Sequence, residues 1–346
     1  MTGRRPLLSI VIPLLNEAES LPALNERLTA LAARLDRDVE YVFVDDGSTD
    51  DSFARLCALR ERDPRVHVLR LSRNFGSHGA CLAGFTYAHG DHVVVLSADL
   101  QDPPETIVEM VAAAERGHEV VLGSREQRDD PASAVFFSSL YNRLMRRIAM
   151  PTWPEKGFDF LLASRRVLDV LLSRRERNTS VFGQILWSGF SQAQVPYRRA
   201  ERHAGRSKWT LSKKIKLAVD SLVSFSYFPI RLISGLGLAC AAFGLLYAGF
   251  VVVMRLTQGT AITGWASLMV VLLVIGGLQL VMLGIVGEYL WRALDEVRGR
   301  PSFIVADAVG FDDPAAVRSP QPSATGRAPL TASAPRARSA TRGSAE

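Results

Sequence analysis

Short apolar runs alternate with amphipathic stretches along the first 125 residues of the chain. The runs have the length of buried strands, and we expect five of them, at residues 8–13, 41–44, 66–71, 93–96 and 120–122. Leucines recur at helical spacing between positions 21 and 35, which predicts an amphipathic helix over residues 18–35. Further helices are predicted at residues 51–62 and 79–89. Such an alternation is typical of an α/β domain with a mostly parallel sheet.

Polar and acidic residues follow the predicted strands directly. The fourth strand continues into the sequence Ser-Ala-Asp-Leu-Gln-Asp and is closed by Pro103 and Pro104, which cannot donate to a sheet and favour the start of a helix. In an open α/β sheet, ligands bind outside the carboxyl ends of the strands. We expect one edge to collect a set of polar side chains: Asn16, Glu17, Asp46, Asp99 and Arg125. Carboxylates there can hold a hard divalent cation together with substrate phosphates; acidic residues that cap the next helix are the alternative.

Two long apolar stretches follow in the second half of the chain. Residues 232–254 and 266–287 contain 23 and 22 residues without a formal charge. As helices, each would reach about 33 Å, enough to cross the hydrocarbon core of a bilayer. Cationic residues flank both stretches, whereas the loop between them carries only Arg255, so the positive-inside rule places both flanks in the cytoplasm. A buried core hairpin is the alternative.

The distribution of charge supports a membrane setting. The formal net charge is +6, and much of the surplus lies beside the apolar stretches and in the tail. This suits an anionic membrane surface or phosphate ligands better than nucleic acid. Residues 210–229 mix lysines with aliphatic residues at helical spacing, as expected of a helix in the membrane interface; a plain surface helix is the alternative. Three cysteines without metal-ligand spacing favour a reducing compartment.

The predicted organisation is a catalytic domain, a membrane hairpin and a tail. The ranges are 1–209 for a cytoplasmic catalytic domain, 210–229 for the amphipathic helix, 230–292 for two transmembrane helices (about 232–254 and 266–288), 293–310 for a cytoplasmic juxtamembrane segment and 311–346 for the tail. The tail is rich in Ala, Pro, Ser and Arg, a composition that predicts disorder.

Together these segments resemble a known protein family. The motifs are SIVIPLLNE at residues 9–17, VDDGS at 44–48, ADLQDPPE at 98–105 and RHAGRSKW at 202–209. With the double membrane span, they resemble the family 2 inverting glycosyltransferases of the glycosyltransferase-A fold, specifically the bacterial polyprenyl-phosphate sugar transferases of the undecaprenyl- or dolichyl-phosphate type. The resemblance extends from Leu8 to about Val305, which is nearly everything before the tail.

The resemblance implies functional residues, position by position. Donor-binding positions are matched by Pro13, Leu15, Glu17, Val44, Asp46, Ala98, Asp99, Gln101, Arg125, Arg202 and Lys208. Catalytic roles are implied for Asp99, Arg125, Asp159 and Lys208. A divalent Mg²⁺ or Mn²⁺ ion is implied at Asp99 and Gln101, where Ser97 replaces the first acid of the usual Asp-x-Asp pair. A serine hydroxyl is a weaker, neutral ligand, so Asp99 would carry more of the ion.

We therefore expect a membrane-anchored glycosyltransferase. It would move a sugar from a UDP- or GDP-linked donor to a polyprenyl phosphate, such as undecaprenyl phosphate. The product would be a lipid-linked sugar for modification of cell-envelope glycans or lipids. We expect a multi-pass protein of the bacterial inner membrane with both termini cytoplasmic, compatible with a homo-oligomer. A polysaccharide-chain synthase would need further membrane helices and a Gln-x-x-Arg-Trp motif, neither of which occurs in the sequence. A catalytically impaired sugar-nucleotide-binding protein is favoured only by Ser97.

Overall fold

The computed structural model describes residues 5–125, 132–154, 157–158, 160–173, 180–198, 228–258 and 264–312. In this part of the chain, eight strands form one sheet in the order β7-β5-β6-β4-β1-β2-β3-β8. The strands are β1 (Leu7–Leu14), β2 (Asp38–Asp45), β3 (Val66–Leu71), β4 (His92–Val95), β5 (Val120–Arg125), β6 (Phe160–Ser164), β7 (Gln192–Tyr197) and β8 (Val305–Val309). Only β6 and β8 run antiparallel to the others, which confirms a mostly parallel α/β sheet.

Helices connect these strands and cover both faces of the sheet. They are α1 (Leu21–Ala32), α2 (Ser52–Arg62), α3 (Ser77–Tyr87), α4 (Thr106–Glu115), α5 (Ala132–Leu144) with a π-helical turn η1 (Met145–Ala149), α6 (Arg165–Leu172), α7 (Val181–Trp187), α9 (Phe228–Gln258) and α10 (Trp265–Val297). The helix expected at 79–89 begins two residues earlier, directly after Gly76, whose φ of +87° is favourable only for glycine. The turn at Gly76 therefore fixes where α3 starts.

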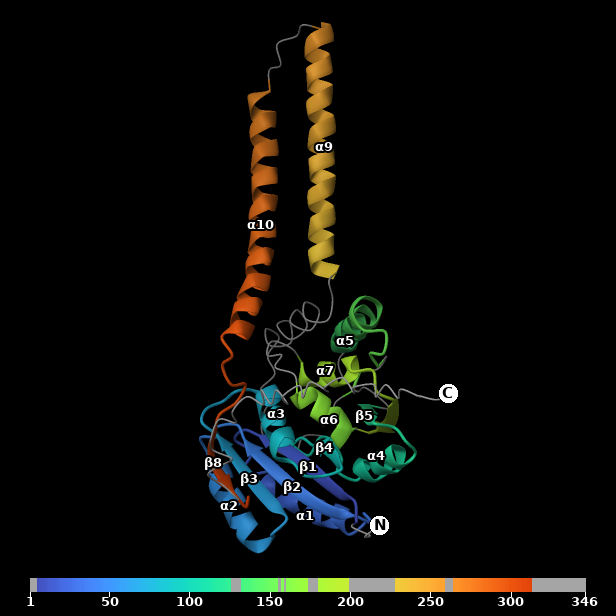
Figure 1. The fold of residues 1–346 in the computed structure, drawn as a ribbon, viewed down its shortest axis with the longest axis vertical. Helices are drawn as coiled ribbons and strands as arrows, with labels where there is room; N and C mark the ends of the chain where they lie inside the picture. Colours follow the sequence, from blue (N-terminus) through green and yellow to red (C-terminus); the bar gives the residue numbers. More distant parts are fainter. Residues whose placement is uncertain are drawn as a thin grey trace, which may run out of the picture.

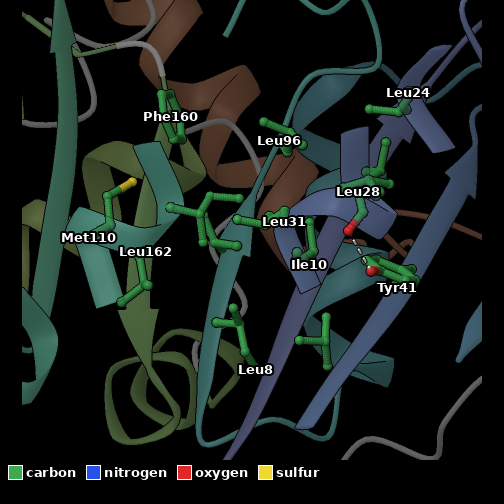
Figure 2. Packing of buried hydrophobic residues seen from close by; sticks show 14 of the residues in the cluster. Leu8, Ile10, Leu24, Leu28, Leu31, Tyr41, Leu96, Met110, Phe160 and Leu162 are labelled. Carbon is green, nitrogen blue, oxygen red and sulfur yellow. Dashed lines mark hydrogen bonds between the residues drawn. The ribbon is translucent and has the colours of Figure 1, made fainter. Parts of the chain in front are cut away.

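Two hydrophobic layers hold the domain together. On one face, Leu24 and Leu28 of α1 pack with Ile10 of β1 and Met110 of α4 in a buried cluster, as Figure 2 shows. Tyr41 lies in the same layer, and its hydroxyl donates to the Leu28 carbonyl oxygen at 3.0 Å. On the other face, α3, α6 and α7 cover the same strands. Because both faces are buried, the parallel strands read as nearly continuous apolar runs, which is why the sequence reveals them.

The chain returns to the sheet after the apolar helices. Strand β8 pairs with β3, and Ser72 N–H donates to the Ile304 carbonyl oxygen at 2.9 Å. The rings of Phe303 and Phe311 pack edge-on against Tyr87 of α3 at 6.4 and 6.0 Å. Residues 305–309 of the expected juxtamembrane segment 293–310 therefore complete the sheet. Phe311, the first residue of the expected tail 311–346, packs on α3.

The two apolar helices project together from the α/β domain (Figure 1). The spans Ile233–Met254 and Leu268–Val297 are long and apolar enough to cross a membrane, and neither is buried inside the protein. A Cβ atom at Gly237 would lie 2.8 Å from Met282 Cε, so the helices meet there. These spans support the expected pair of membrane helices. Apart from its last two residues, which begin α9, the amphipathic segment 210–229 lies outside the described residues.

Replacing Gly84 by alanine is expected to destabilise the domain by about 1–3 kcal/mol, because it overpacks the core. The new Cβ would lie 2.2 Å from Val11 Cγ1 of β1, so α3 would have to move away from the sheet. Thermal unfolding of the detergent-solubilised protein measures this. Gly276→Ala in α10 is the matched control, because no atom of the described residues lies within 4 Å of its added Cβ. Equal melting temperatures for both variants would contradict the prediction.

Candidate active site

The carboxyl ends of β1, β2, β4 and β5 lie on one edge of the sheet. Pro13 of β1 is paired in register with Val44 of β2, and Leu15, Glu17 and Asp46 follow directly. The side chains of Val44 and Ala98 are buried in the two hydrophobic layers. These two residues could therefore contact a donor only through their backbone, whereas the polar side chains at the same edge are placed to bind one.

Two loops at this edge are tied to each other. Asn16 adopts φ +52°, a left-handed conformation that asparagine tolerates better than most residues. Its N–H donates to Ser48 Oγ at 2.8 Å, and its Oδ1 accepts from Thr49 N–H at 2.7 Å. Glu17 N–H donates to Ser52 Oγ at 3.0 Å. The loop that carries Glu17 is thus held in place by the loop that follows β2.

Adjacent acids at the end of β2 have different roles. Asp45 is fully buried, and its Oδ1 accepts from Ser48 N–H at 2.8 Å, so it braces the turn. The Asp46 carboxylate accepts from Phe75 N–H at 2.7 Å and from Gly76 N–H at 2.9 Å. Burial raises the pKa of Asp46 above its usual value, against the lowering effect of these two hydrogen bonds. Asp46 therefore fixes the loop that leads into α3.

The acidic segment after β4 contains an unusual backbone conformation. Leu100 has φ +59°, which is costly for a residue with a bulky side chain and is frequent at functional sites. On one side of it lies Asp99, which is buried, and on the other lies Gln101, which is half-buried. Gln101 N–H donates to Asp99 Oδ1 at 3.2 Å. This turn places a carboxylate and an amide together at the end of β4.

Asp102 has a partner that the sequence did not indicate. The hydroxyl of Tyr197 on β7 donates to Asp102 Oδ1 at 2.5 Å, and both side chains are buried. The Tyr197 ring also packs edge-on against Phe160 of β6 at 5.2 Å. Because 95 residues separate the two partners, spacing carries no signal of the contact. The pair anchors the acidic segment to the far strands of the sheet.

Replacing Tyr197 by phenylalanine is expected to lower stability by about 1–3 kcal/mol, because a buried carboxylate loses a hydrogen-bond donor. The ring contact with Phe160 would persist, so the change isolates the hydroxyl. Thermal unfolding and transfer rate should be measured together. Tyr87→Phe, whose ring packs on Phe303 in the same edge-on manner, is the control for removing a hydroxyl. An unchanged melting temperature in Tyr197→Phe would show that the hydrogen bond to Asp102 does not stabilise the fold.

The residues after β4 suit a hard divalent ion that arrives with phosphates. In the described residues, no group of three or more His, Cys, Asp or Glu side chains could hold a metal. Asp99 offers a carboxylate, Gln101 an amide oxygen and Ser97 a hydroxyl, all of them hard oxygen donors. Magnesium is commonly held by one or two carboxylates together with substrate phosphates. This donor set therefore fits an ion shared with a nucleotide diphosphate.

Several predicted site residues fall outside the described part of the chain. These are Asp159, Arg202 and Lys208, whose assigned roles stay predictions. Arg125 is described and ends β5, where it is paired in register with Tyr197 of β7. The structure thus brings Glu17, Asp46, Asp99, Gln101 and Arg125 to the same edge of the sheet.

Comparison with known proteins extends over nearly the whole chain. Residues 9–172 match Glycosyl transferase family 2. The chain is 36% identical over 303 residues to the bactoprenol glucosyl transferase of Shigella phage SfII, covering 86% of this chain and 97% of that protein. It is 39% identical over 326 residues to the undecaprenyl-phosphate 4-deoxy-4-formamido-L-arabinose transferase of Pseudomonas syringae pv. syringae, covering 92% and 95%.

Among solved structures, glucosyl-3-phosphoglycerate synthase from Mycobacterium tuberculosis matches with a TM-score of 0.47 and 19% identity, over 62% of this chain and 76% of that chain. That likeness is too distant to carry a functional argument. The sequence relatives carry it instead, because they match 86% and 92% of this chain at more than 35% identity. The chain therefore belongs to glycosyltransferase family 2, among the bacterial polyprenyl-phosphate sugar transferases.

Proposed function

We propose that this protein transfers one sugar from a nucleotide sugar to a polyprenyl phosphate at the cytoplasmic face of the bacterial inner membrane. The observation that carries the proposal is the match, over 86% and 92% of this chain, to transferases named for bactoprenol and for undecaprenyl phosphate. The two apolar spans suit a lipid acceptor, and the polar edge of the sheet suits a nucleotide diphosphate. The cationic flanks of the spans favour the cytoplasmic orientation.

In this proposal, the polar edge divides into two parts. Glu17 and Asp46, with the loops that they order, hold the base and ribose of the donor. Asp99 and Gln101 would hold a Mg²⁺ or Mn²⁺ ion beside the pyrophosphate, and such an ion would supply positive charge that stabilises the leaving nucleoside diphosphate. Cations bind the remaining phosphate oxygens: Arg125, Arg202 and Lys208.

The proposed reaction is a direct displacement at the anomeric carbon. An oxygen of the lipid phosphate forms the new bond as the bond to the donor phosphate breaks, and the anomeric configuration inverts. A phosphate monoester has a second pKa of about 6, so the nucleophile is already mostly ionised at neutral pH. A general base is then dispensable, and we assign Asp159 to orienting the sugar or stabilising positive charge at the anomeric centre.

A donor panel tests the proposal. The purified protein in detergent is given short-chain polyprenyl phosphate and, in separate reactions, radiolabelled UDP-glucose, UDP-N-acetylglucosamine, GDP-mannose or UDP-linked 4-deoxy-4-formamido-L-arabinose. One donor should yield a lipid-phosphate sugar in Mg²⁺ or Mn²⁺ and none in chelator. Binding of a donor without transfer would favour the catalytically impaired alternative.

Replacing Ser97 by aspartate is expected to lower the metal concentration that gives half-maximal transfer, because a second carboxylate strengthens a hard-ion site. The measurement is a Mg²⁺ and Mn²⁺ titration of the initial rate. Ser97→Ala is the matched control. It should leave the midpoint near its wild-type value, because a neutral serine hydroxyl is a weak ligand. An unchanged midpoint in Ser97→Asp would place the ion away from residue 97.

A further inference from the structure

The imidazole of His78 is buried without a hydrogen bond to any described residue. Both ring nitrogens are covered, and neither has a partner in the part of the chain that the structure describes. An unpaired buried polar group costs about 1–3 kcal/mol, and native proteins leave few such groups unsatisfied. A group of this kind beside the polar edge of an enzyme is therefore a candidate for pairing with substrate.

The location of His78 suits that role. It lies in the first turn of α3, two residues after Gly76, whose N–H is held by Asp46. Helix α3 packs against α7 on the same face of the sheet (Figure 1). The His78 ring meets the Phe182 ring of α7 edge-on at 5.8 Å, and Phe182 meets Phe158 at 6.0 Å. His78 thus lies where the half of the domain that contains Asp46 meets the half that contains α7.

These three rings lie at the margin of the core, and Phe158 and Phe182 pack against its buried residues. His78, Phe158 and Phe182 are each partly exposed, although both nitrogens of His78 are covered. A ligand can pair with the imidazole only when the side chains that cover its nitrogens move aside. Aromatic rings beside one hydrogen-bonding group form a mostly apolar site in which the polar group fixes the orientation of the ligand.

The protonation state of His78 indicates the chemistry of the ligand. Burial lowers the pKa of His78 below its usual value, so the ring is neutral at pH 7. A neutral imidazole presents one donor and one acceptor. A phosphate oxygen without a proton can only accept and would leave one ring nitrogen unmatched, whereas sugar hydroxyls both donate and accept and can satisfy both.

We propose that His78 binds hydroxyl groups of the donor's sugar and is a specificity-determining residue of this enzyme. The proposal rests on the proposed function and goes beyond it by naming a side chain that recognises the sugar itself. The nucleotide is held elsewhere along the edge, at Glu17 and Asp46. His78 should therefore contribute to the affinity for a nucleotide sugar and not to the affinity for the free nucleotide.

The test compares dissociation constants for free nucleotide and nucleotide sugar in the full-length protein. The probe is whichever of UDP-glucose, UDP-N-acetylglucosamine, GDP-mannose and UDP-linked 4-deoxy-4-formamido-L-arabinose the wild type turns over, paired with its free UDP or GDP. In His78→Phe we expect about 10- to 100-fold weaker binding of the nucleotide sugar and at most a twofold change for the free nucleotide. His78→Gln, which keeps a donor and an acceptor, should recover part of the loss.

His67→Phe is the matched control, because His67 also has an unpaired buried ring nitrogen but lies near the start of β3, at the opposite edge of the sheet. It should leave both constants unchanged. The proposal would be overturned if His78→Phe weakened the binding of free nucleotide and of nucleotide sugar equally, or weakened neither. His78→Gln supplies the same comparison if the phenylalanine variant does not fold. A wild type that turns over none of the four donors would contradict the proposed function instead.

Discussion

Asp99→Asn is expected to lower the transfer rate by about 100- to 1,000-fold, the range seen when one group that stabilises transition-state charge is removed. Asp99 is the only carboxylate in the segment 97–101, so the ion proposed there depends on it. Asparagine has nearly the same volume, and its side-chain oxygen can still accept from Gln101 N–H, which now donates to Asp99 Oδ1. The turn around Leu100 should therefore survive, and the loss should be one of chemistry.

The measurement is the initial rate of lipid-linked sugar formation as a function of Mg²⁺ or Mn²⁺ concentration. A weakened ion site raises the half-maximal metal concentration and lowers the plateau. Asp102→Asn is the matched control, since its carboxylate contacts Tyr197; it should reduce stability while the metal midpoint stays the same. An Asp99→Asn enzyme with a wild-type midpoint and plateau would move the ion elsewhere.

Sequence patterns predict the parts of this fold that depend on local order. Pro13 lies one residue before the end of the first strand. Asp46 and Asp99 follow the apolar runs 41–44 and 93–96 by two and three residues. Because parallel strands share a carboxyl edge, the polar edge follows from the strands alone. The five predicted strands are confirmed, and the helix expected at 18–35 shortens to Leu21–Ala32.

Contacts between distant parts of the chain could not be predicted in this way. Strand β8 joins β3 although more than two hundred residues separate them, and its sequence, VADAV, is not a continuous apolar run because Asp307 lies at its centre. The two acids at 45 and 46 are indistinguishable in sequence. Only the three-dimensional structure shows that Asp45 braces its own turn whereas Asp46 holds the loop after β3.

Asp46→Asn is expected to weaken donor binding by about 10- to 100-fold, because it disorders a loop as well as changing a side chain at the donor site. Both carboxylate oxygens now accept, one from Phe75 N–H and one from Gly76 N–H. An amide offers one oxygen and one NH₂ group, so in either rotamer an NH₂ faces a backbone N–H and that bond is lost. The loop before α3 would then lose part of its anchor. This loop lies close to Gly47, where an added Cβ would be 2.8 Å from the Arg73 backbone carbon.

Isothermal titration with the free nucleotide measures the loss of affinity, and limited proteolysis between residues 72 and 78 measures the loosening of the loop. Asp50→Asn is the matched control, because its carboxylate also accepts two backbone N–H bonds, from Ala18 at 3.2 Å and from Ser52 at 3.0 Å. Asp50 is exposed, so a water molecule can accept the backbone N–H bond that the amide NH₂ group cannot. The Asp50→Asn variant should therefore bind nucleotide nearly as the wild type does. A similar loss of nucleotide affinity in both variants would contradict the prediction, because any broken loop contact would then have the same effect. A loss of affinity confined to Asp46→Asn would tie donor binding to the loop that this buried carboxylate holds.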